Sequence, residues 1–158
     1  MASVKQAFGS ATAFTKTNAN LASSVTAGWM SNAIDNSTNL YLDALIHVEL
    51  AAVNTAPASN KAIYLYAYAL IDTAGSAYTS TGDGTPSGSE GTLTFPDITT
   101  LPVVMPPLAV IGYPVQNKAI NAGPFSVAQC FGGTLPPKWG IAMINYSGMT
   151  LSVTNIKY

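Results

Sequence analysis

His47 is the only histidine in the chain, so any catalyst that uses imidazole and any metal site that uses histidine must be built around it. On an extended strand Asp43 and Glu49 would lie on the same face as His47, because alternate side chains share a face. Two carboxylates near a histidine can hold a metal ion or raise the pKa of the imidazole. We favour the simpler interpretation, an ordinary charged face that is solvated or lies in an interface.

Cys130 is the only cysteine, which excludes an internal disulfide and a multi-cysteine zinc site. A nucleophile pair of Cys130 with His47 is conceivable. The sequence around Cys130, residues 128–133, does not match a cysteine-hydrolase motif. We therefore interpret Cys130 as a buried structural thiol.

The acidic residues give no recognisable site. Asp83 lies between two glycines, but the ligand spacing and the closing glutamate of an EF-hand are missing. No pairing of carboxylates of the kind used by glycosidases is indicated, and the chain has no P-loop, dinucleotide fingerprint or nucleophile elbow. We predict no catalytic residue, no cofactor and no metal, and hence a protein that is not an enzyme.

The residues that would position His47 form the clearest pattern in the chain. Between residues 39 and 50, apolar and mainly polar side chains alternate, with Leu45 as the exception. This alternation predicts a strand with one buried face, roughly 40 Å long at about 3.3 Å per residue. Residues 35–38 before it have the short polar side chains of a turn.

A second strand is predicted over residues 61–71, with aliphatic side chains on one face and three tyrosines, Tyr64, Tyr66 and Tyr68, on the other. We expect the aliphatic face inward and the tyrosines outward. Tyrosines in line can stack on a sugar or contact a protein. The alternative is that the aromatic face packs under a neighbouring strand or loop.

The rest of the chain predicts further strands between glycine- and proline-rich connections. Residues 72–91 form a long loop, residues 98–107 a proline-stiffened crossing between sheets, and residues 145–148 a hairpin turn. The remaining strands are expected over residues 93–95, 108–115, 125–128, 140–146 and 151–158. Seven or eight strands in all predict an all-β fold, a β-sandwich or jelly roll.

Residues 1–29 differ from the rest, because they are rich in Ala, Ser, Thr and Asn. Such a segment buries too little surface of its own to offset its ordering entropy. We predict an extended N-terminal arm over residues 1–29 that lies on another surface, followed by one β-sandwich domain over residues 30–158. Its apolar side chains include Phe8, Phe14, Leu21 and Trp29.

Charge is scarce in this sequence of 158 residues. Charged residues make up 8% of it and hydrophobic residues 48%, against about 25% charged in an average soluble domain. The chain has no arginine and its net charge is −1, which argues against nucleic-acid partners. Prolines and polar residues interrupt its uncharged stretches, 98–117 and 139–156, so we expect no membrane span, and we expect a soluble protein without an export signal.

Several stretches, taken in order, resemble a known group of proteins. The chain is similar to small structural proteins of tailed bacteriophages, the capsid decoration or cement proteins of jelly-roll type, from about residue 20 to the end. The stretches that carry this resemblance are residues 21–24, 35–43, 60–68, 135–141 and 145–148.

The resemblance implies a virion structural protein, made in the host cytoplasm, that binds the major capsid protein on the capsid surface and contacts neighbouring copies of itself. We expect the arm to lie along the coat lattice, and the tyrosine face or the glycine-rich loop over residues 72–91 to contact a neighbour. The alternatives are a carbohydrate-binding module and a tail or fibre component. The expected protein-interface residues are Phe8, Phe14, Leu21, Trp29, Tyr64, Tyr66 and Tyr68.

Overall fold

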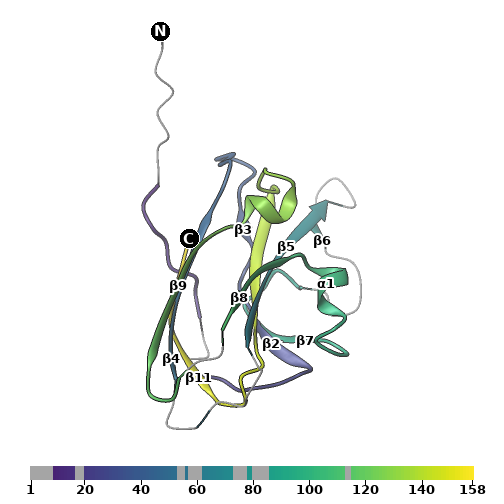
Figure 1. Ribbon diagram of the computed structural model, residues 1–158. Helices are drawn as coiled ribbons and strands as arrows, with labels where there is room; N and C mark the ends of the chain where they lie inside the picture. The colour runs from purple at the N-terminus through teal and green to yellow at the C-terminus, as the bar shows by residue number, and fades with distance from the viewer. Residues whose placement is uncertain are drawn as a thin grey trace.

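The computed structural model describes residues 9–16, 20–52, 56, 62–72, 78–79, 86–112 and 115–158. Their regular secondary structure is almost entirely β, which confirms the predicted all-β class (Figure 1). The described strands outnumber the seven or eight predicted, and three of them are only two residues long. The elements are β1 Asn20–Leu21, β2 Ala27–Met30, β3 Ile34–Asp35, β4 Leu45–Ala52, β5 Ile63–Asp72, β6 Tyr78–Thr79, β7 Gly91–Thr94, α1 Leu101–Val104, β8 Pro107–Ile111, β9 Ala119–Ser126, the 3-10 helix η1 Ala128–Phe131, β10 Lys138–Asn145 and β11 Leu151–Lys157.

The strands form two antiparallel sheets with the main core between them. The four-stranded sheet has the order β1-β11-β4-β9, and the seven-stranded sheet has the order β6-β5-β10-β2-β7, with β3 also on β10 and β8 also on β5. β10 is the central strand, because it lies between β5 on one side and β2 and β3 on the other. All eight of its residues pair with β5. Side chains from both sheets share one core cluster, which includes Ile46 and Val48 of β4, Leu65 of β5, Ile141 of β10 and Leu151 of β11.

The strand predicted over residues 39–50 is shorter and begins later than its alternation indicates. β4 starts at Leu45, and its side chains Ile46, Val48 and Leu50 are buried as predicted. Residues 36–44 are a loop instead, in which Leu40 and Leu42 face solvent. Hydrogen bonds within this loop and to residues 127–137 hold it off the sheet, so the first part of the prediction is wrong.

The proline-rich segment does not cross between the sheets. It joins β7 at one edge of the seven-stranded sheet to β8 at the other edge, and it therefore runs across the outer face of that sheet. Leu101 of α1 and Met105 pack there with Tyr66 and Tyr68 of β5 in a second core cluster. The prediction of a crossing between sheets is therefore wrong, and the segment covers one face of a single sheet.

Residues 145–148 do not close a hairpin, because β10 and β11 belong to different sheets. They form an arch between the sheets that is organised by the buried Asn145. The side-chain amide of Asn145 donates to the carbonyl oxygens of Leu21 and Met149 at 2.8 and 2.6 Å, and its Oδ1 accepts from the amide and hydroxyl of Ser147. The arch therefore fixes the N-terminal segment as well as the two sheets.

The predicted division at residue 29 is not a boundary in the structure. Residues 12–14 hydrogen-bond along β11, β1 continues along the same strand, and β2 lies inside the seven-stranded sheet between β10 and β7. The Phe14 ring lies 6.1 Å from the Trp139 ring and 4.8 Å from the Tyr158 ring. From residue 12 onward, the described part of the expected arm is built into the sandwich.

Candidate protein-interaction surface

The tyrosine face of β5 is largely buried. Tyr66 and Tyr68 are 3% and 2% exposed under the α1 segment, and Tyr64 is half-buried. The Tyr68 hydroxyl donates to the carbonyl oxygen of Ser31 at 2.6 Å. Burial raises the pKa of Tyr66, and it raises the pKa of Tyr68 to about 12. Packing under a loop, the alternative interpretation, holds for Tyr66 and Tyr68, which are not available as contact residues.

The expected arm residues also lie inside the chain where the structure describes them. Phe14 and Trp29 belong to the main core, and Leu21 packs against it half-buried. The indole Nε1 of Trp29 donates to Oε1 of Glu90 at 2.7 Å. Phe8 lies outside the described residues. Phe14 and Trp29 therefore act as core residues.

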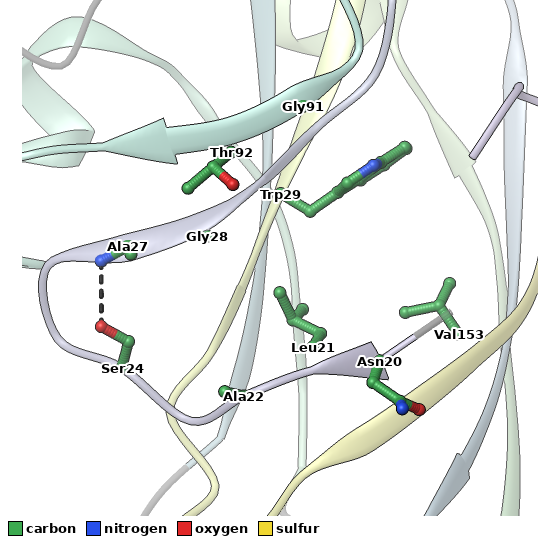
Figure 2. Close-up of a pocket in the computed structure, with 10 residues that line it drawn as sticks. All are labelled: Asn20, Leu21, Ala22, Ser24, Ala27, Gly28, Trp29, Gly91, Thr92 and Val153. Carbon is green, nitrogen blue, oxygen red and sulfur yellow. Dashed lines mark hydrogen bonds between the residues drawn. The ribbon is translucent and has the colours of Figure 1, made fainter. Parts of the chain in front are cut away.

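A groove of about 180 Å³ lies at the side of the sandwich. Figure 2 shows Leu21 of β1, Trp29 of β2 and Val153 of β11 around it. At the turn between β1 and β2, the Ser24 hydroxyl accepts a hydrogen bond from the amide of Ala27 at 3.0 Å. The lining residues are small, apolar or uncharged, so the groove offers no acid–base or metal-binding group.

The residues singled out around His47 do not form one site. His47 and Glu49 lie 4.0 Å apart on the exposed face of β4, with Nε2 facing Oε1. Asp43 is not on that face, because its Oδ1 accepts from the amides of Ala44 and Ala128 at 2.7 and 2.9 Å. Over the described part of the chain, no three His, Cys, Asp or Glu side chains gather closely enough to hold a metal ion.

Cys130 is a half-buried residue of η1 that packs against the main core. Burial and the nearby Asp43 carboxylate raise the pKa of its thiol. A raised pKa disfavours the thiolate, which is the nucleophilic form. The raised pKa agrees with a structural thiol, but Cys130 is half-buried and not buried as predicted.

Three consecutive apolar side chains project from one end of the sandwich. Leu40, Tyr41 and Leu42, which we call the 40–42 loop, are 71%, 59% and 76% exposed. Their backbone follows the polar turn that ends β3 and precedes β4. Consecutive exposed residues of this size are more typical of an interaction site than of scattered surface hydrophobics.

The side chain of Asn36 holds the 40–42 loop in place. Asn36 is buried, its Oδ1 accepts from the amide of Tyr41 at 2.8 Å, and its Nδ2 donates to the carbonyl oxygen of Tyr41 at 3.0 Å. Leu40 has a φ of 52°, a left-handed conformation that costs roughly 1–2 kcal/mol in a residue with a Cβ. These hydrogen bonds thus hold the loop in a conformation in which Leu40 is both strained and exposed.

A second segment, residues 127–137, supports the 40–42 loop from the other side. The amide of Leu135 donates to the carbonyl oxygen of Leu42 at 3.2 Å, and the amide of Val127 donates to that of Ala44 at 3.0 Å. The amide of Asn36 donates to the carbonyl oxygen of Pro137 at 2.7 Å. The two segments therefore form one rigid end of the molecule.

A hollow of about 210 Å³ lies directly beside the projecting side chains. Leu40, Tyr41 and Leu42 form one of its walls, and Leu135 and Pro137 contribute to the rest. The lining residues carry no charge. Projecting apolar groups and an apolar hollow thus lie next to each other, which is suited to contact with another protein.

Sequence reasoning missed this surface because Leu40 and Leu42 continue the alternation of β4. Two signals in the sequence point to it. Leu45 breaks the alternation where the loop ends, and the Asp35-Asn36-Ser37 turn supplies the amide side chain that holds the loop.

A scan against protein-family models, a search of curated proteins and a search of solved structures each return nothing that matches this chain. Among the residues that the structure describes, no helix has the length and apolar character that a membrane crossing requires. The function is therefore inferred from the geometry of the chain and from its sequence pattern.

Proposed function

We propose that this chain is a non-enzymatic virion structural protein, a capsid decoration or cement protein that binds the outside of a phage capsid and stabilises it by bridging coat subunits. The observation that carries the proposal is the hydrogen-bonded 40–42 loop, which displays apolar side chains on a chain with few charged residues. Such a surface suits contact with other protein subunits, either coat subunits or neighbouring copies of this chain. The resemblance to decoration proteins of jelly-roll type supports the same assignment.

The chemistry of the described residues also fits a role in adhesion. His47 and Glu49 are exposed and stand apart from Asp43, and the pKa of Cys130 is raised. In neither arrangement is a nucleophile activated by an adjacent base. The carbohydrate-binding alternative loses support, because Tyr66 and Tyr68 are buried and cannot stack on a sugar.

Binding to capsids tests the proposal. Purified protein is mixed with capsids that lack it, sedimented and quantified against coat protein, with capsids of an unrelated phage as the control. We expect saturable binding in a fixed ratio to coat subunits and a higher disruption temperature of the decorated shells. Binding at only a few sites per particle would indicate a tail component, and binding to glycans without affinity for coat protein would indicate a carbohydrate-binding module.

A further inference from the structure

The surface at the 40–42 loop has the properties of a patch that can bind a copy of itself. In a two-fold dimer the same patch meets itself, so its projections must fit its own recesses. Here the projecting Leu40 and Leu42 lie beside a hollow of about 210 Å³. A cavity of about 150 Å³ can hold benzene, so this hollow has room for one leucine side chain.

The lack of charge at this surface also favours a second copy of the chain as its partner. When a patch meets its own copy, each unpaired charge near the axis faces an identical charge, which opposes association. The residues that line the hollow are uncharged. The nearest charged side chains along the chain already have partners within the molecule. Asp35 forms an ion pair with Lys138 at 3.6 Å, and Asp43 accepts hydrogen bonds from two backbone amides.

We propose that two copies of this chain associate about a two-fold axis at the 40–42 loop, with Leu42 of each copy entering the hollow of the other. The loop requires little rearrangement to bind, because Asn36 and residues 127–137 already hold it. Three side chains supply less than the roughly 800 Å² per partner of a standard interface. The dimer is therefore weak in dilute solution and forms where copies are concentrated.

Sedimentation over a range of concentrations tests this association. The mass of the wild-type protein is expected to rise from 16.3 kDa toward twice that value with concentration. Leu42→Ser should weaken the association by at least about a hundredfold, because it removes two buried leucines from each dimer. Val103→Ser is the matched control, since Val103 is also highly exposed but lies on α1, and it should associate like the wild type.

Crosslinking tests the two-fold arrangement. In a Cys130→Ser background, Leu42→Cys should form a disulfide-linked dimer under mild oxidation, and Val103→Cys should not. Three outcomes overturn the proposal: a wild-type protein that stays monomeric at about millimolar concentration, a Leu42→Ser variant that associates like the wild type, or growth beyond the dimer. Self-association does not depend on a virion role, so a chain that dimerises but does not bind capsids would retain this inference and lose the proposed function.

Discussion

Gly140 shows how closely single residues are fitted in the seven-stranded sheet. It pairs across the strands with Tyr68, whose ring covers it. A Cβ added at Gly140 would lie 2.3 Å from Cζ of Tyr68, and the Tyr68 ring is buried and held by its bond to Ser31. The position therefore requires glycine for space and not for backbone conformation.

Gly140→Ala should lower the free energy of unfolding by about 1–3 kcal/mol, the usual cost of overpacking a core. Urea denaturation followed by tryptophan fluorescence measures the change. Gly112→Ala is the matched control, because a Cβ there meets no atom within 4 Å. Equal losses in the two variants would contradict the steric explanation.

Tyr68 also makes stability depend on alkaline pH. Burial raises the pKa of Tyr68 to about 12, whereas an unfolded tyrosine titrates near 10. Above pH 10 the unfolded chain has lost this proton and the folded chain keeps it, so stability should fall by roughly 2–3 kcal/mol up to about pH 12. Tyr68→Phe should reduce this fall and leave a smaller one from Tyr66, whose pKa is also raised.

Denaturation at a series of pH values checks this prediction. At neutral pH, Tyr68→Phe should cost about 1–3 kcal/mol, because the carbonyl of the buried Ser31 loses the hydroxyl donor. The same slope above pH 10 in both proteins would show that Tyr68 is not the group responsible.

At the scale of elements, the N-terminal segment is part of the sandwich and should be needed for folding. Deleting residues 1–28 would remove Phe14, β1 and half of β2. It would also leave Asn145 without the carbonyl of Leu21. We expect this truncation to abolish cooperative thermal unfolding, as measured by circular dichroism.

The matched truncation removes residues 1–8 only and keeps every one of those contacts. We expect it to retain a cooperative transition. A folded and stable protein after deletion of residues 1–28 would restore the original expectation of a separable arm.

Elements defined by local pattern were predictable from the sequence. The strands expected over residues 61–71 and 151–158 correspond to β5 and β11, because alternating aliphatic and polar or aromatic side chains specify one buried face. The pairing of elements was not predictable in this way. Residues 145–148 have the same turn chemistry in a hairpin and in an arch, and only contacts with β4 and β5, distant in sequence, decide between the two.

The candidate surface was hidden from the sequence for a related reason. Leu40 and Leu42 have the parity of Ile46 and Val48, so the alternation assigns all four to one buried face. Their exposure results from bonds between the 40–42 loop and residues 127–137, some ninety residues away along the chain. The local sequence pattern gives no indication of those hydrogen bonds.

At the scale of the whole molecule, scarcity of charge determines how contacts respond to salt. Six lysines and seven acidic residues are spread over 158 positions, and the 40–42 loop and its hollow are lined by uncharged residues. Salt weakens contacts between exposed charges by screening them, whereas sulfate strengthens the burial of apolar surface. Contacts of this protein should therefore respond to the kind of salt more than to its ionic strength.

We expect the dissociation constant of self-association to change less than about twofold between about 0.05 and 0.5 M sodium chloride, because screening has few charges to act on. Sodium sulfate at the same ionic strength should tighten the association, since it favours apolar burial. Sedimentation in the two salts, with Leu42→Ser as the matched variant, provides the measurement. A steep loss of association in sodium chloride would instead identify charged groups as the source of affinity, and the apolar loop would then be a minor part of the interface.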